Sequence, residues 1–297
     1  MKRGSLCVLA SIICLASAQM ASAETLLGLT PLGPFQIGPF QIGPFDTIVS
    51  LNSDSPTLPT GLKLVRGLAQ GESLVAIDIR PATGVLFGVG VSDNNAQLYS
   101  IDLATGQATA VGSVFANLDN PPGTTFGFDF NPTIDRVRLV SSTNQNIVFN
   151  PDTGAVSMPL ATDLFYATGD VNEGTDPDVS NIAYDNNVGG AMTSQQRGID
   201  VETDSLVTVA NNAGTLGTIG PLGNQLFDAV SATGFDVSGS TGVGYAIITR
   251  NFVTAPGLYT INLTTGLATL RGFPLLGMLP VNGLSVLPPP APLGASR

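Results

Sequence analysis

The sequence has 297 residues, of which 43% are hydrophobic and 11% are charged, and its 35 glycines and 21 prolines are typical of a folded chain with many turns. Its formal charge of −11 argues against binding to nucleic acid or to anionic membranes. Because there is no histidine and both cysteines lie in the first 14 residues, the rest of the chain excludes Ser-His-Asp catalysis, Cys-His catalysis and histidine or structural zinc sites.

Residues 1–23 have the pattern of a secretory signal peptide. Lys2 and Arg3 form a positive start, residues 6–15 form a short apolar core, and small residues precede Glu24 as a cleavage site. A membrane anchor fits poorly because this core is too short to span a bilayer, and no later stretch predicts a span. We expect an exported protein, periplasmic or secreted. Removing residues 1–23 leaves 9 basic against 22 acidic residues, a formal charge of −13.

An unusual repeat follows a first strand that we expect over residues 24–30. Residues 33–45 read GPFQIGPFQIGPF, and each proline removes a backbone hydrogen-bond donor. The repeat therefore predicts an exposed loop or edge. Either it displays its phenylalanines to a partner or it is a duplication that a surface loop tolerates.

The clearest structural unit covers residues 74–112, where apolar and polar residues alternate as in short strands. It ends in a hairpin with a Thr-Gly turn, in which Gly106 supplies a left-handed conformation and Asp102 can bond the turn backbone. Similar hairpins return over residues 258–272 and, less closely, over residues 146–159.

Five segments along the chain share one pattern with a period near fifty residues. They are VAIDIRP (75–81), FGFDFNP (126–132), IAYDNNV (182–188), TGFDVSG (233–239) and NGLSVLP (282–288). The shared aspartates are Asp78, Asp129, Asp185 and Asp236; Ser285 takes the fifth place, which gives spacings of 51, 56, 51 and 49 residues. Such a period, with four strands in each repeat, indicates the blades of a propeller.

We therefore predict an all-β fold, a five-bladed β-propeller with four-stranded antiparallel blades, as a single domain over residues 24–287. The N- and C-terminal strands would close one blade and leave no long edge exposed. A two-sheet sandwich also fits short strands and turns, but it does not explain the period. Residues 288–297 are expected to form a disordered tail.

Side-chain size along the repeat supports this fold. Two positions before each shared site stands a small residue, as expected for strands that crowd around an axis: Ala76, Gly127, Ala183, Gly234 and Gly283. Between them stands a large apolar residue that would fill the seam between blades: Ile77, Phe128, Tyr184, Phe235 and Leu284.

Taken together, several motifs resemble a bacterial family of domains of unknown function, numbered 4394, over nearly all of the expected mature chain. They are IDIRPATGVLFGVG, FGFDFNPTIDRVRLVS, LYSIDLATGQATAVG, GDVNEGTDPDVSNIAY and LYTINLTTGLATLRG. The resemblance implies an exported, propeller-like domain and carries over no functional residues. The GPFQI repeats depart from the family pattern.

The four blade aspartates are the first candidate site. If Asp78, Asp129, Asp185 and Asp236 point to the axis, their carboxylates could hold a hard cation or another ligand, or supply an acid and a base for glycosidic cleavage. The alternative is that each aspartate caps the turn that follows it.

The second candidate is the acidic loop GDVNEGTDPDV. Asp170, Asn172, Asp176 and Asp178 surround Gly174 and loosely resemble the oxygen ligands of a calcium loop, so Ca²⁺ is the one cofactor that the sequence suggests. The spacing departs from that of an EF-hand. The alternative is a solvated acidic loop.

For function, the sequence favours a non-enzymatic, exported binding or interaction module, monomeric, with an unknown protein or small-molecule ligand and no nucleic acid. The first alternative is a carboxylate-pair glycoside hydrolase or lyase that uses two blade aspartates. The absence of tryptophan and an aromatic content of 6% weigh against it, because sugar rings usually stack on aromatic faces. The second alternative is a structural envelope protein.

Overall fold

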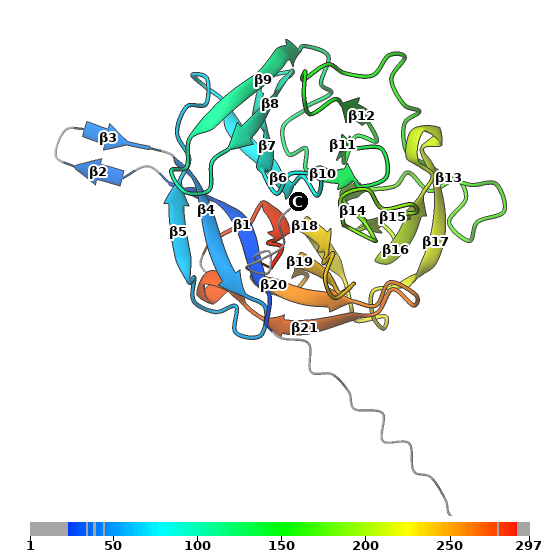
Figure 1. Cartoon of the computed structure of the whole chain (residues 1–297). Helices are drawn as coiled ribbons and strands as arrows, with labels where there is room; N and C mark the ends of the chain where they lie inside the picture. Colours follow the sequence, from blue (N-terminus) through cyan, green and yellow to red (C-terminus); the bar gives the residue numbers. More distant parts are fainter. Residues whose placement is uncertain (1–22, 34, 38–39, 44, 278, 290–297) are drawn as a thin grey trace, which may run out of the picture.

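Five small sheets stand in a ring around one axis in the computed structural model (Figure 1). The structure describes residues 23–33, 35–37, 40–43, 45–277 and 279–289. The predicted signal peptide up to residue 22 and the predicted tail from residue 290 lie outside these residues. Among the described residues we find no helix with the length and hydropathy needed to cross a membrane.

Four of the five sheets follow one another along the chain. Each runs outward from its innermost strand, except that one short outer strand of blade 4 precedes the inner strand. Blade 2 contains β6 (Ser73–Ile79), β7 (Leu86–Ser92), β8 (Asn95–Ile101) and β9 (Ala108–Phe115). Blade 3 contains β10 (Phe126–Asn131), β11 (Arg136–Ser141) and β12 (Asn146–Phe149). Blade 4 contains β14 (Val179–Tyr184), β15 (Gln196–Asp200), β16 (Ser205–Val209), β17 (Thr215–Pro221) and the short β13 (Phe165–Tyr166), which pairs parallel to β17. Blade 5 contains β18 (Ala229–Val237), β19 (Gly244–Arg250), β20 (Val253–Ile261) and β21 (Ala268–Gly272).

Blade 1 joins the two ends of the chain. Its order is β22 (Gly283–Val286), β1 (Thr25–Leu32), β4 (Phe45–Asn52) and β5 (Gly61–Leu64), with β22 innermost. β22 pairs antiparallel with β1. The predicted five-bladed β-propeller, closed by its N- and C-terminal strands, is therefore confirmed.

Two blades differ from the predicted four strands within the described residues: blade 3 has three strands, and blade 4 has five. In blade 3 an isolated bridge between Phe149 and Val156 stands where a fourth strand is expected. Pro151 and Pro159 flank this stretch, and neither can donate a backbone hydrogen bond to a ladder.

The GPFQI repeat forms a small hairpin of β2 (Phe35–Ile37) and β3 (Phe40–Ile42), which projects from the ring in Figure 1.

The apolar core is divided among the seams between blades. The described residues form five buried clusters, and each draws on two adjacent blades, as in the cluster that joins Leu98 of blade 2 to Phe128 of blade 3. The large residues predicted for the seams are placed there in four blades: Ile77, Phe128, Phe235 and Leu284. In blade 4 the counterpart of these residues is Ile182. Tyr184 is buried in the same seam, where its hydroxyl accepts a hydrogen bond from Arg138 of blade 3.

Candidate functional site

Three of the predicted blade aspartates meet near the axis. Asp78 of β6, Asp129 of β10 and Asp236 of β18 each offer a carboxylate oxygen, and these oxygens lie within 4.8 Å of one another. All three side chains are at most 1% exposed. We call these three residues the aspartate cluster.

Each carboxylate is held by the innermost strand of the next blade. Asp78 Oδ2 accepts a hydrogen bond from the amide of Phe130 at 3.0 Å, and Asp129 Oδ1 accepts one from the amide of Tyr184 at 3.2 Å. Asp236 Oδ2 accepts one from the amide of Val286 at 2.6 Å. These bonds replace the predicted capping of the following turn, except that Asp236 also accepts from its own neighbour, Val237.

Ser285 completes the sequence of contacts around the axis. Its Oγ accepts a hydrogen bond from the amide of Ile79 at 3.1 Å and donates to Asp78 Oδ1 at 2.8 Å. The same Oγ lies 3.4 Å from Asp236 Oδ2. The serine therefore stands in blade 1 where three other blades place an aspartate.

Asp185 does not join the cluster, because the repeat in blade 4 is shifted by two residues from the predicted alignment. The inner strands of blades 2, 4 and 5 each contain a bulge. The bulge ends at Ala76 in blade 2, at Asn181 in blade 4 and at Gly234 in blade 5. Asn181 is thus the counterpart of the small residues, and Ala183 is the counterpart of the aspartates. Asp185 instead forms an ion pair with Arg197 at 2.6 Å.

Burial and mutual repulsion disfavour the ionised form of the cluster. Burial, and then the carboxylate of Asp236, raise the pKa of Asp78 well above its usual value. Burial and the two other carboxylates do the same to the pKa of Asp129. Burial raises the pKa of Asp236 to about 7. The cluster therefore retains a proton or requires a positive charge near neutral pH.

The inner strands seal the cluster from one end of the axis. A Cβ added at Gly127 would lie 2.8 Å from the Cα of Asn181, and one added at Gly234 would lie 2.7 Å from the amide nitrogen of Leu284. These glycines therefore permit the close approach of neighbouring strands. The space that these strands enclose near the axis has a volume of about 10 Å³, which is too small for a sugar ring. The blade aspartates therefore cannot serve as an accessible carboxylate pair from that side.

A cavity of about 270 Å³ lies at the other end of the axis. Its lining includes Ile79, which follows Asp78 in the chain, and Asn187 and Val286, which both donate hydrogen bonds to Asp236. Asn187 donates from its side chain to Asp236 Oδ1 at 3.1 Å. We call this space the lower cavity.

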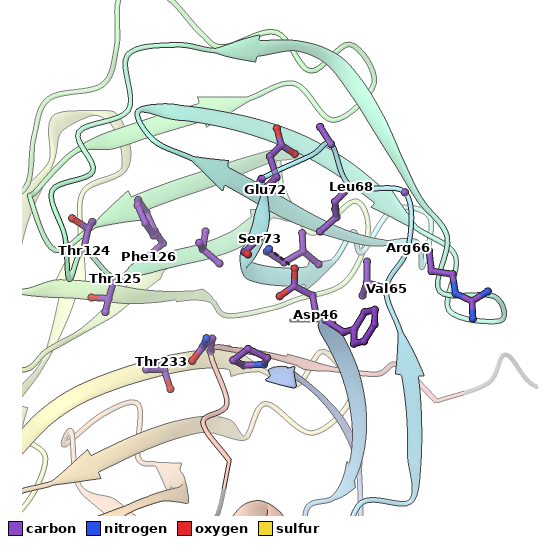
Figure 2. Close-up of a pocket in the computed structure, with 18 residues that line it drawn as sticks. Asp46, Val65, Arg66, Leu68, Glu72, Ser73, Thr124, Thr125, Phe126 and Thr233 are labelled. Atoms are coloured by element: carbon purple, nitrogen blue, oxygen red, sulfur yellow. Dashed lines mark hydrogen bonds between the residues drawn. The ribbon is translucent and has the colours of Figure 1, made fainter. Parts of the chain in front are cut away.

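A larger cavity of about 710 Å³ opens where the inner strands begin (Figure 2). Apolar side chains form part of its lining, among them Val65, Leu68 and Phe126. Its polar residues come from loops and strands of blades 1, 2, 3 and 5: Asp46, Arg66, Glu72, Ser73, Thr124, Thr125, Thr233 and Asn282. We call this space the mouth cavity.

Two carboxylates give the mouth cavity an acidic character. Asp46 Oδ2 accepts a hydrogen bond from the amide of Leu74 at 2.9 Å, and burial raises the pKa of Asp46. Glu72 Oε2 accepts a hydrogen bond from the hydroxyl of Tyr99. The guanidinium of Arg66 points away from the other labelled side chains in Figure 2. The second oxygen of each carboxylate has no hydrogen bond within the described part of the chain.

The acidic loop is not drawn together around one point. Asp170 accepts hydrogen bonds from the amide and the hydroxyl of Thr218, and the Asn172 side chain donates to the same hydroxyl at 3.0 Å. Asp176 accepts from Asn144 at 2.7 Å. The carboxylate of Asp178 is half-buried, and burial followed by nearby acidic groups raises its pKa. The calcium role of this loop stays a prediction.

The mouth-cavity residues were missed by the sequence analysis. Asp46 follows the GPFQI repeat, and Glu72 and Thr124 lie in connections whose sequences do not recur from blade to blade. Thr233 and Asn282 open two of the five repeated segments, which is the one signal that could have pointed to this face.

Comparison with known proteins identifies a family but no activity. The family model for a domain of unknown function (DUF4394) matches residues 47–283. No curated protein matches the sequence.

Several solved structures are similar to the chain. TolB from Acinetobacter baumannii has 10% identity and a TM-score of 0.48, and the match covers 90% of this chain and 67% of TolB. A protein of unknown function from Bacteroides thetaiotaomicron has 14% identity and a TM-score of 0.48, with 82% and 58% covered. A putative 6-phosphogluconolactonase from Bacteroides uniformis has 10% identity and a TM-score of 0.44, with 85% and 83% covered. Similarities this distant say nothing about a ligand.

Proposed function

This chain belongs to the DUF4394 family of domains of unknown function, and we propose that it is an exported, non-enzymatic module that binds a small polar ligand in the mouth cavity. The observation that carries the proposal is the cavity itself, which combines an apolar lining with a few polar groups from four blades. Small-molecule sites usually have volumes of about 300 to 1,000 Å³ and this kind of lining. The cavity of about 710 Å³ lies within that range.

The polar groups favour a ligand that donates hydrogen bonds. Asp46 and Glu72 each keep one carboxylate oxygen free of hydrogen bonds within the described residues, while the one cation of the lining, Arg66, points away. Hydroxyl and ammonium groups are the donors that carboxylates bind best. The acidic charge of the chain also attracts cations and repels anionic ligands.

A carboxylate-pair hydrolase is the second candidate, now at the mouth cavity. One observation favours it: Asp46, with a pKa raised by burial, lines the same space as Glu72. A raised pKa suits a carboxyl group to the role of general acid, and Glu72 would supply the second carboxyl group of the pair. The enclosed aspartate cluster offers no such access.

Ligand binding can be tested with two probes and a matched pair of variants. Calorimetric titration with D-glucose tests hydroxyl donors, and titration with spermidine tests ammonium donors. Ser73→Trp places bulk at the exposed rim of the mouth cavity, whereas Thr109→Trp places the same bulk on the exposed β9 strand. We expect one probe to bind the parent protein and Thr109→Trp, and to lose at least tenfold in affinity for Ser73→Trp.

Binding that survives Ser73→Trp, or an absence of heat with both probes, would contradict the mouth-cavity proposal. An assay with nitrophenyl glycosides separates the second candidate. Hydrolysis that is lost in Asp46→Asn would replace the binding function with a catalytic one.

A further inference from the structure

We infer that the aspartate cluster binds one calcium ion, which joins blades 2, 3 and 5 across the axis. This site is separate from the mouth cavity and does not depend on the function proposed there. Three carboxylate oxygens from three different strands lie within 4.8 Å of one another. Oxygen ligands of Ca²⁺ stand about 2.3 to 2.6 Å from the ion, so two ligands on opposite sides of it lie about 5 Å apart. The observed spacing therefore fits a shared ion.

The geometry of the cluster is fixed in advance by the backbone. Amides of Phe130, Tyr184 and Val286 each hold one carboxylate, so the side chains do not need to reorganise to surround an ion. A pre-organised site binds more tightly because less conformational entropy is lost on binding. Ser285 Oγ, which lies 2.8 Å from Asp78 Oδ1, adds a neutral oxygen to the donor set.

One oxygen in the cluster is left over. Asp129 is 0% exposed, and its Oδ2 has no hydrogen-bond partner within the described chain. A buried polar atom without a partner is costly and is usually explained by a bound water or ion. Its neighbours in the cluster are carboxylates, which donate only if one of them keeps a proton. A cation fits this oxygen and also offsets the mutual repulsion of the three groups.

The basic residues near the cluster are engaged elsewhere. Arg138 is opposite Asp129 in the pairing of β10 with β11, but its guanidinium donates to the hydroxyl of Tyr184 and to the side chains of Asn146 and Asn212. Arg197, opposite Ala183, pairs with Asp185. Among the described residues, none of the three cluster aspartates forms a salt bridge. The charge of three carboxylates is therefore not balanced by the protein.

Calcium fits this site better than magnesium. The donors are all oxygens, which hard cations prefer, and the site is enclosed. Mg²⁺ usually keeps several waters and demands an octahedral arrangement, whereas Ca²⁺ accepts bidentate carboxylates and irregular geometry. The lower cavity comes within one residue of the cluster, because its lining residues Asn187 and Val286 both donate hydrogen bonds to Asp236.

The test is a calcium titration of the EDTA-treated protein after dialysis into metal-free buffer. We expect one Ca²⁺ per chain by calorimetry. We also expect a rise in melting temperature of about 5 °C when the calcium concentration is a hundred times the dissociation constant. No heat and no shift at millimolar calcium would overturn the inference, and this measurement needs no variant.

Matched variants locate the ion. Asp129→Asn keeps the shape of the side chain and removes its charge, and we expect it to abolish the calcium-dependent shift. Asp185→Asn removes the blade aspartate that lies outside the cluster, and we expect it to keep the shift. A shift that persists in Asp129→Asn, or that is lost in Asp170→Ala of the acidic loop, would place the ion elsewhere and contradict the inference.

Discussion

At the scale of single residues, the axis is organised by aspartates that bond to the following blade. The sequence analysis identified all three members of the aspartate cluster but also included Asp185, because Ala183-Tyr184-Asp185 has the same small-large-acid pattern as Gly127-Phe128-Asp129. The bulge that ends at Asn181 sets the true register of blade 4. A bulge depends on pairing with the neighbouring strand, so it could not be predicted from residue types alone.

The cluster predicts an unusual dependence of stability on pH in the absence of metal. A carboxyl group whose pKa is raised by folding stabilises the folded state below the unfolded pKa, and this stabilisation is lost as the pH rises through the folded pKa. The unfolded value is 3.8, and the pKa of Asp236 is about 7. With EDTA present, we therefore expect the melting temperature to fall between about pH 4 and pH 7, which a series of thermal melts can measure.

Two variants check the origin of that slope. Asp129→Asn removes one of the repelling charges and should flatten the fall, while Asp185→Asn should leave it unchanged. The pKa values of Asp152 and Asp170 are lowered, so their contribution is lost only below about pH 4, outside this window. A melting temperature that rises from pH 4 to pH 7 in the parent protein would contradict the prediction.

At the scale of elements, the Thr-Gly hairpins connect neighbouring blades as well as neighbouring strands. Asp102 Oδ1 accepts hydrogen bonds from the amides of Ala104 and Thr105, and Gly106 has a φ of 77°, as the sequence predicted. The carbonyl of Gly106 also accepts a hydrogen bond from the amide of Arg66 in the connection that follows β5. This second contact crosses from blade 2 to blade 1, and a local sequence pattern carries no information about it.

Comparing two glycines separates the turn from the contact between blades. Gly84 and Gly106 both have left-handed φ values after a threonine, but an added Cβ meets nothing within 4 Å at Gly84 and lies 2.1 Å from the carbonyl oxygen of Leu64 at Gly106. We expect Gly84→Ala to cost about 1 kcal/mol of unfolding free energy, which is the cost of the backbone conformation. Gly106→Ala should cost roughly 1 to 3 kcal/mol more, because the neighbouring blade must move. Denaturant unfolding measures both values, and equal losses would contradict the role of the hairpin as a contact between blades.

At the scale of the whole molecule, the period near fifty residues was sufficient to predict the ring and its closure. Large residues in the seams and small residues at the axis follow from packing sheets around a centre, so they recur and can be recognised. The mouth cavity could not be predicted in this way. Glu72 and Thr124 occupy connections that differ from blade to blade, and Asp46 lies at the start of β4. These residues meet only because the ring brings their segments to one face.

Ring closure can be tested by shortening the chain at two places. Ending the chain at Pro280 removes β22, whose Leu284 and Val286 are 2% and 7% exposed. Burial of two such side chains contributes roughly 3 to 6 kcal/mol, so we expect a large loss of stability and of cooperative unfolding. Ending the chain at Pro289 keeps every described strand, and thermal melts should then match those of the parent protein. Equal melting temperatures for both shortened chains would contradict closure through β22.

The pairing of β22 with β1 also determines which side of the propeller would face a surface to which the protein is attached. The amide of Leu287 donates to the carbonyl of Thr25 at 2.9 Å, so the two ends of the described fold lie side by side. β22 begins directly after Asn282, which lines the mouth cavity, and ends at Val286, which lines the lower cavity. Both ends of the described fold therefore lie on the side away from the mouth cavity. A linker, fusion partner or solid support attached at either end of the described fold would therefore leave the mouth cavity facing outward and accessible to diffusing molecules.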